Sequence, residues 1–253
     1  MKARSRSSSI QTKRFSARKA AASGTAWTKT AVLQELRGLA DPRVKTKMAY
    51  FGVDVEKAHG ISAPVLHQFA KGIGKSQELA EQLWQTGFHE ARILAALIGE
   101  PHKITGAQME RWVRDFDSWD VVDTVCCYLY AQAKPAWAKV DLWSRRSPEF
   151  EKRAAFSLMA YLSYKDKEAP DQRFLRFLPV VEREAHDERN FVRKAVNWAL
   201  RNIGKRNLSL NRAAIETAER VRAQNSRAAR WIAADALREL KSAAVQARLR
   251  KRK

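Results

Sequence analysis

The stretch FDSWDVVD holds the two residues whose types and spacing are best suited to chemistry. Trp119 and Asp123 are four positions apart, so on a helix they share one face. A fixed carboxylate stabilises a developing positive charge, and the face of an indole ring attracts a cation. Asp117 or Ser118 is expected to cap this helix, and Asp120 in its first turn to interact favourably with the helix dipole. Asp123 lies beyond the first turn, so neither capping nor the dipole explains it. The pair therefore indicates a site for positive charge, with simple packing plus a salt bridge as the alternative.

Other kinds of chemistry find little support in the sequence. The five histidines show no pairing at metal-ligand spacing, and no HExxH, CxxC, glycine-rich phosphate loop or nucleophile motif is present. We therefore expect no metal and no cofactor. The only cysteines, Cys126 and Cys127, are adjacent within an apolar pattern, which favours packing and a reducing compartment over a disulfide.

The distribution of charge indicates a polyanionic partner. The 48 Lys+Arg and 27 Asp+Glu residues give a net charge of +21. Residues 1–24 carry seven basic side chains and residues 241–253 carry six, both without an acidic one, so the middle keeps 35 basic against 27 acidic residues. Because no apolar run is long enough to cross a bilayer, nucleic acid is a better partner than membrane. The alternative is that the basic tails serve only solubility.

Apolar residues recur along the chain with a period of 3.6 residues, and the alternation typical of strands is absent. The fold is therefore predicted to be all-α. Glycine and proline fall between the periodic segments, where helices are expected to stop. Thr105 and Gln108 have the spacing of a capping box. The predicted helices span 28–39, 42–51, 63–72, 76–86, 88–98, 106–116, 119–132, 136–145, 149–164, 171–185, 190–204, 209–223 and 226–240.

An internal recurrence predicts how these helices are arranged. The segment 152–158 (KRAAFSL) recurs as 193–199 (RKAVNWA) and as 226–232 (SRAARWI), at offsets of 41 and 33 residues. These offsets are near the period of helix-pair repeats, in which neighbouring hairpins stack into a curved solenoid. Basic residues at the matching positions would line its concave surface, unless they form ordinary solvated helix faces.

The composition divides the chain into three predicted segments. Residues 1–24 are rich in serine, arginine and lysine and are expected to form a basic disordered tail, either a targeting segment or a DNA-seeking arm. Residues 25–240 are expected to form the HEAT-like repeat domain, and residues 241–253 a basic C-terminal tail into which the last helix frays.

From about Tyr50 to Leu240 the sequence resembles the AlkD-type DNA alkylation repair glycosylases, which are built from HEAT-like repeats. Each motif alone is weak, but their order and spacing are specific. The matching segments are Gly60–Pro64, Glu90–Arg92, Trp112–Val113, Trp119–Asp123 (the WDxxD segment), Lys152–Ala155 and Phe191–Arg201.

The resemblance implies a role for each matching residue. Trp119 and Asp123 would face the lesion, Arg153 would hold the DNA beside the damaged nucleotide, and Trp198 would complete the aromatic surround. Further DNA contacts are expected from basic and aromatic positions, which are Lys194, Arg201, Arg193, Trp231 and Tyr50.

The chain departs from the family pattern in places that bear on substrate range. Family members can carry a second aromatic residue where Ser118 or Asn190 stands here, and the N-terminal aromatic residue is either Tyr50 or Phe51.

The implied function is that of a monofunctional glycosylase acting on N3- or N7-alkylated purines in double-stranded DNA. Alkylation makes the purine a cationic leaving group, so rupture of its glycosidic bond gives the sugar oxocarbenium character that a carboxylate can stabilise. No strong general acid is needed, because the base departs neutral. We expect a monomer in the cytoplasm, associated with the nucleoid in a bacterium, while the basic N-terminus leaves organellar targeting open.

Two other functions stay open. Relatives that lack the Trp, Asp and Arg set bind DNA without excising bases, so a non-catalytic binder of damaged or branched DNA is the first alternative. The second is a helical-repeat scaffold whose basic groove receives acidic peptides.

Overall fold

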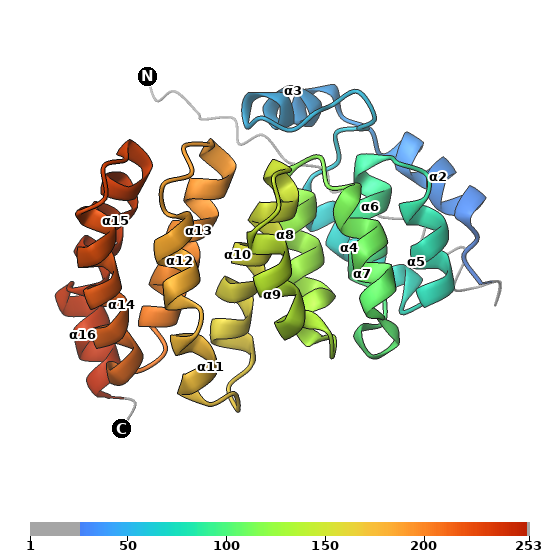
Figure 1. Ribbon diagram of the computed structural model, residues 1–253. Helices are drawn as coiled ribbons and strands as arrows, with labels where there is room; N and C mark the ends of the chain where they lie inside the picture. The colour runs from blue at the N-terminus through green and yellow to red at the C-terminus, as the bar shows by residue number, and fades with distance from the viewer. Residues whose placement is uncertain (1–25, 252–253) are drawn as a thin grey trace, which may run out of the picture.

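The computed structural model describes residues 26–251, and every regular element in that range is a helix (Figure 1). The predicted all-α class is confirmed. The helices are α2 (Lys29–Gly38), α3 (Pro42–Tyr50), α4 (Ala63–Ile73), α5 (Gln77–Trp84), α6 (His89–Ile98), α7 (Gly106–Arg114), α8 (Trp119–Tyr128), α9 (Ala136–Ser144), α10 (Glu149–Lys165), α11 (Asp171–Leu175), α12 (Leu178–Glu184), α13 (Asn190–Gly204), α14 (Leu208–Arg222), α15 (Arg227–Leu240) and α16 (Ala243–Arg250), with 3₁₀ turns η1 (Pro101–Lys103) and η2 (Tyr130–Gln132).

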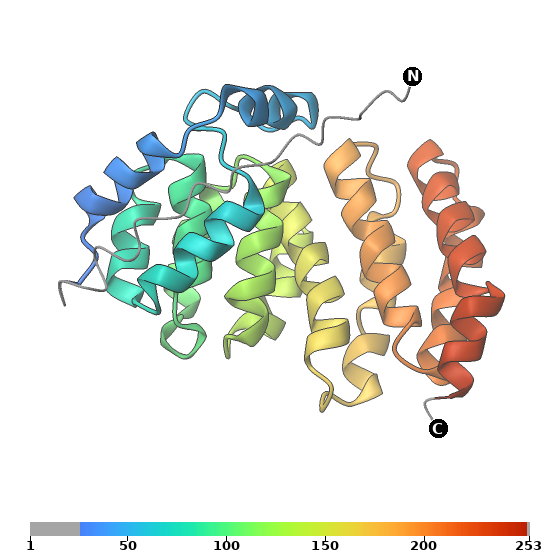
Figure 2. The ribbon, with the colours of Figure 1, turned by 180° about the vertical axis from the view of Figure 1, so that it is seen from behind.

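The helices stack in two rows. One row, called here the inner row, consists of α4, α6, α8, α10, α13 and α15, each in contact with the next (Figure 2). The helices α5, α7, α9, α12 and α14 form the outer row, and α5, α9 and α14 pack against α6, α10 and α15. The recurrent segments 152–158 and 193–199 start at the fourth residue of α10 and of α13, and the segment 226–232 starts at the N-cap of α15, so the recurrence falls on consecutive inner helices. The predicted stack of HEAT-like helix pairs is confirmed.

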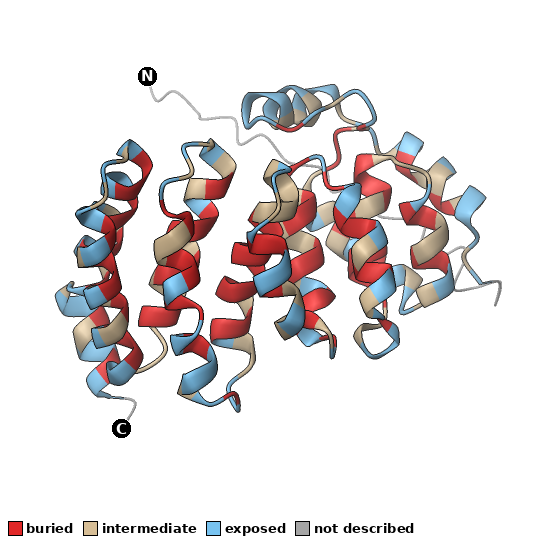
Figure 3. Cartoon of the chain, viewed as in Figure 1, coloured by how far each residue is buried: buried red, intermediate tan, exposed pale blue. Residues whose placement is uncertain are grey.

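The apolar core is one continuous layer between the two rows (Figure 3). Small residues on the inner helices, such as Ala154, Ala195 and Ala229, are fully buried and allow the helices to approach closely. Large aromatic side chains fill the space between the rows, and Trp84 stacks on Trp112 with ring centroids 3.9 Å apart. Each hairpin thus buries its apolar face only against its neighbours.

Two predicted helices are divided. The segment 171–185 forms α11 and α12, because Pro179 has no amide hydrogen to donate and its ring would clash with the preceding turn of a continuous helix. The segment 119–132 forms α8 followed by η2, with the break at Leu129.

The expectation that residues 241–253 form a basic tail needs correction. Residues 243–250 form α16, and Val245 and Leu249 are buried. The Ser242 hydroxyl accepts a hydrogen bond from the Val245 amide and so caps this helix. The two apolar positions are four residues apart on one helix face, which the high basic content of the segment obscures. The expected N-terminal tail, residues 1–24, lies outside the described residues.

The predicted caps are formed only in part. Thr105 accepts a hydrogen bond from the Gln108 amide at 3.1 Å, but the Gln108 side chain is buried without a partner, so the reciprocal half of the capping box is missing. At the start of α8, Ser118 makes no capping bond to a helix amide, and Asp117 pairs with Arg92 instead.

The segment around α3 is held to the stack by a buried carboxylate. Glu90 is fully buried on α6 and accepts hydrogen bonds from the backbone amides of His59, Gly60 and Ile61. Gly60 has a φ of +81°, and a Cβ there would collide with the Asp41 carbonyl oxygen, so this turn requires glycine. Helix α3 itself buries none of its residues and lies over one end of the inner row (Figure 1).

Candidate DNA-binding cleft

A cleft of about 390 Å³ opens on the inner row, and we call it the central cleft. Its walls come from the start of α8, from α10, from α13 and from the residue that follows α3. The side chains that line it are Phe51, Trp119, Asp123, Arg153, Phe191, Lys194 and Trp198. The sequence-predicted residues Trp119, Asp123, Arg153, Lys194 and Trp198 are therefore brought together.

Asp123 is held by three hydrogen bonds. Arg153 donates from Nε to Oδ1 at 3.2 Å and from Nη2 to Oδ2 at 2.7 Å, a two-pronged ion pair. The Ser157 hydroxyl, one helical turn further along α10, donates to Oδ1 at 2.8 Å. The Asp123 side chain keeps 19% of its surface exposed, toward the cleft. The carboxylate is therefore fixed in orientation while it remains accessible.

Arg153 is bound to two neighbouring helices and also lines the central cleft. Its side chain is only 7% exposed, and its third donor, Nη1, reaches the Phe191 carbonyl oxygen at 2.8 Å. With these donors committed to Asp123 and to the backbone of α13, the guanidinium orients the carboxylate and ties α10 to both neighbours. Three of its five N–H donors are thus used within the protein, and the expected contact of Arg153 with DNA stays a prediction.

The aromatic wall at the α3 end comes from Phe51 and not from Tyr50. Trp119 donates from Nε1 to the Phe51 carbonyl oxygen at 3.1 Å, which seats the Phe51 segment on the start of α8. Tyr50 is 84% exposed and does not line the cleft, although it packs edge-on against Phe51. Gly52, with a φ of +78°, would bring a Cβ within 3.0 Å of the Phe191 ring. The tight turn after α3 thus places one aromatic ring of the pair in the cleft.

The opposite wall is built by α13. Trp198 is half-buried and packs edge-on against Tyr161, with centroids 4.9 Å apart. Lys194, one turn before Trp198, is exposed and has no ion-pair partner among residues 26–251. An open aromatic face with a cation beside it suits a base and its phosphate.

Three other predicted DNA contacts lie outside the central cleft. Arg201 is engaged by acidic residues of α15, at 2.6 Å from Glu239 and 3.3 Å from Asp235, so its expected approach to the DNA backbone is not supported by this geometry. Arg193 packs its guanidinium over the ring of Trp231 at 5.1 Å. Trp231 is 39% exposed.

Sequence reasoning missed Ser157 and Phe191 as parts of the site. Ser157 follows Arg153 by one helical turn and falls within the first recurrent segment, a spacing that was available as a signal. Phe191 follows Asn190, where the family can show an aromatic residue, so one aromatic side chain is present one position later. Asn190 itself begins α13.

A second ion pair supports the helix that carries Trp119 and Asp123. His89 Nε2 on α6 lies 3.0 Å from Asp120 Oδ2 on α8. Burial alone would lower the pKa of His89, but the Asp120 carboxylate outweighs it and raises the pKa above the ordinary value. Burial would raise the pKa of Asp120, and the histidine outweighs it and lowers that pKa. Asp120 thus ties α8 to the preceding inner helix, as Asp123 ties it to the following one.

The described residues show neither a metal site nor a membrane span. Within residues 26–251 no three His, Cys, Asp or Glu side chains gather at metal-binding distance. No helix in the same range is long and apolar enough to cross a bilayer.

Comparison with solved structures identifies the fold. The chain is similar to a structure described as "a new family of proteins related to the HEAT-like repeat DNA glycosylases with affinity for branched DNA structures". The TM-score is 0.70 at 23% sequence identity, over 84% of this chain and 95% of that one. Among curated proteins no match was found.

The family is shown by the sequence itself. Residues 32–240 match the model of the DNA alkylation repair enzyme family. The chain belongs to this family, and the match spans the helical stack from α2 to α15.

Proposed function

We propose that the protein removes N3- or N7-alkylated purines from double-stranded DNA by hydrolysing the N-glycosidic bond. The observation that carries the proposal is the central cleft, in which one oriented carboxylate, Asp123, faces a space walled by the indoles of Trp119 and Trp198. Membership of the alkylation repair family supports the same conclusion.

The cleft suits a reaction in which positive charge moves from the base to the sugar. In the bound state the alkylated base is cationic, and the indole faces of Trp119 and Trp198 can each attract it by about 0.5–2 kcal/mol. As the glycosidic bond breaks, its electron pair goes to the base, which leaves neutral, and the sugar becomes an oxocarbenium ion. A carboxylate beside that sugar stabilises the cation and orients the attacking water, which adds to the sugar carbon and loses a proton.

Arg153 and Ser157 act as positioning residues in this scheme. Their three hydrogen bonds fix both Asp123 oxygens before DNA arrives, so the carboxylate does not need to reorganise as charge develops. Arg153 also reduces the net negative charge of the pair, which lowers the repulsion of nearby phosphates in the ground state.

The site as proposed works without a cofactor and in a single chain. All residues assigned to the reaction come from α8 and α10, with the second indole from α13 of the same chain. We accordingly propose that the active form is a monomer.

The test is the release of free base from alkylated duplex DNA by the full-length chain in single-turnover conditions. A duplex carrying 7-methylguanine should lose that base, whereas a duplex carrying a neutral lesion such as hypoxanthine should not, because a neutral base lacks the positive charge that makes an alkylated purine a good leaving group. Trp198→Ala should slow release, and the matched control Trp231→Ala, which removes an exposed indole outside the cleft, should leave it near the wild-type rate. Absence of base release from a folded, DNA-saturated protein would refute the proposal.

A second candidate is a DNA binder without catalytic activity. It is favoured because Asp123 already forms an ion pair with Arg153 in the free protein. Such a pair between consecutive inner helices can simply stabilise the stack, as His89–Asp120 does. This candidate predicts that 7-methylguanine stays attached while the duplex binds, which the same assay reports.

A further inference from the structure

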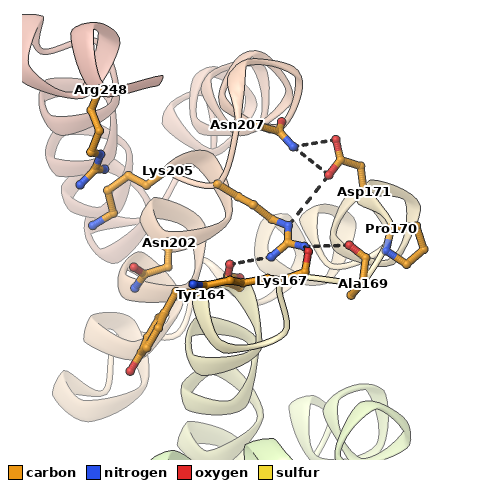
Figure 4. Close-up of a pocket in the computed structure, with 11 residues that line it drawn as sticks. Tyr164, Lys167, Ala169, Pro170, Asp171, Asn202, Lys205, Asn207 and Arg248 are labelled. Atoms are coloured by element: carbon orange, nitrogen blue, oxygen red, sulfur yellow. Dashed lines mark hydrogen bonds and ion pairs between the residues drawn. The ribbon is translucent and has the colours of Figure 1, made fainter. Parts of the chain in front are cut away.

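A second, larger cleft lies at the other end of α10 and α13. Its volume is about 630 Å³, and we call it the basic cleft (Figure 4). It is bounded by the end of α10 and the following loop, by the end of α13, and by α16. The residues that matter here are Tyr164, Lys167, Asn202, Lys205, Arg206 and Arg248.

The cations of this cleft fall into two groups. Arg206 donates to the backbone carbonyls of Ser163, Asp166, Lys167 and Ala169, so it builds the wall. Lys167 and Arg248 are exposed at its rim, and neither side chain has an ion-pair partner within residues 26–251.

Asp171, which lines the cleft, and the neighbouring Glu239 both have basic partners, and Arg206 Nε lies 4.0 Å from Asp171 Oδ1. Both carboxylate oxygens of Asp171 accept from the Asn207 amide at 2.9 Å. Glu239 accepts from Lys205 at 2.8 Å and from Arg201 at 2.6 Å. Among the residues that line the cleft the unpaired charge is therefore positive, as a phosphate-binding surface requires, while the exposed Glu168 follows Lys167 outside the lining.

An aromatic row connects the basic cleft with the central cleft. Tyr164 is 46% exposed in the basic cleft and lies 5.6 Å from Tyr161 between ring centroids. Tyr161 in turn lies 4.9 Å from Trp198, which lines the central cleft. From Arg153 to Tyr164 the rise along α10 is about 16 Å, which a nucleic acid strand covers in about five steps of 3.4 Å.

We infer that the basic cleft binds an unpaired strand of nucleic acid that continues from the duplex at the central cleft. Lys167 and Arg248 would contact its phosphates, and Tyr164 would stack on a base. Within a duplex the base faces are already stacked on one another, so away from the duplex ends only an unpaired base can stack on Tyr164. The inference rests on the DNA-binding part of the proposed function and not on base excision.

The test compares two lesion-free DNAs in fluorescence anisotropy with the full-length chain. One is a blunt duplex, and the other is the same duplex with a single-stranded extension of about eight nucleotides. We expect tighter binding of the extended DNA. Tyr164→Ala should reduce that preference by about fivefold to a hundredfold, whereas Tyr164→Phe, which keeps the ring, should retain it.

Charge reversal tests the phosphate contacts. The double variant Lys167→Glu/Arg248→Glu should abolish the preference and reduce the salt slope on extended DNA by about 1.4, the value for two single-strand contacts. The matched control Arg114→Glu/Arg212→Glu changes the net charge equally at two exposed positions of the outer row and should keep the preference.

Three results would overturn the inference. They are equal wild-type affinity for both DNAs, equal loss of preference in the control, and displacement of the strand by a free deoxynucleotide at equal concentration, which would assign the cleft to mononucleotides. Failure of the proposed function would be seen separately, as absent binding of the blunt duplex or, in the base-release assay, as absent release of 7-methylguanine from the alkylated duplex.

Discussion

Replacement of Asp123 by asparagine separates a catalytic carboxylate from a structural one. The amide keeps the shape but removes the charge, and it brings an NH₂ group toward the donors of Arg153 and Ser157. Breaking a fully buried ion pair costs about 3–5 kcal/mol. Because 19% of the Asp123 side chain is exposed, we expect a cost somewhat below this scale, about 2–3 kcal/mol.

Both consequences of Asp123→Asn can be measured. For a chain of this size each kcal/mol lowers the melting temperature by about 2–4 °C, so we expect a fall of roughly 4–12 °C. Loss of one preorganised electrostatic group should slow single-turnover base release by about tenfold to a thousandfold, or roughly 1.4–4 kcal/mol. Release is measured well below the lowered melting temperature, on protein shown to be folded by circular dichroism.

Asp120→Asn is the matched control. Asp120 lies on the same helix, forms an ion pair with His89 of the preceding inner helix, and does not line the central cleft. It should lower the melting temperature by a similar amount and leave base release near the wild-type rate. Wild-type release by Asp123→Asn, or equal slowing by both variants, would remove Asp123 from the mechanism.

Two further predictions concern stability. Because the pKa of His89 is raised, its ion pair with Asp120 contributes its full share to the free energy of unfolding below the ordinary histidine value of 6.5. This stabilisation is lost as the pH rises through the raised pKa. Because the pKa of Asp120 is lowered, the stabilisation persists at acidic pH down to the ordinary aspartate value of 3.8. The melting-temperature difference between wild type and His89→Gln should therefore be larger at about pH 6 than at about pH 9, and a difference independent of pH would contradict the pairing. Removal of residues 243–253 should destabilise the fold by up to about 3–6 kcal/mol, because Val245 and Leu249 lose their burial. An unchanged midpoint in urea denaturation would show that α16 contributes nothing to the stack.

The sequence allowed the helices and their stacking to be predicted because both depend on local patterns. Apolar periodicity gave the helices, and glycine and proline marked most of their ends. The recurrence at α10, α13 and α15 gave the repeat. Pro179 was harder to interpret, because proline is compatible with the first turn of a helix and its position alone does not reveal that a new helix begins there. The basic composition of α16 likewise concealed two buried positions.

The sequence predicted which residues form the candidate site better than it predicted the contacts between them. Spacing placed Trp119 and Asp123 on one face, but the partner of Arg153 lies 30 residues away, and a charged side chain can bind either phosphate or carboxylate. Only the packing of α8 against α10 selects Asp123. In the same way, the turn at Gly52 decides which of Tyr50 and Phe51 enters the cleft, and Arg201 forms ion pairs with acidic residues of α15 that the sequence pattern did not reveal.

Helix α3 contributes to the wall of the central cleft but little to the stability of the helical stack. It buries no residue of its own, yet the residue after it forms a wall of the central cleft, and the bond from Trp119 to the Phe51 carbonyl ties that wall to α8. A segment with so few buried contacts opens with a free energy far below that of global unfolding. Mutations that make the stack more rigid would therefore leave the mobility of this wall of the cleft almost unchanged. Substitutions within residues 42–52 can thus reshape this wall without altering the repeats that hold the Asp123 carboxylate in place.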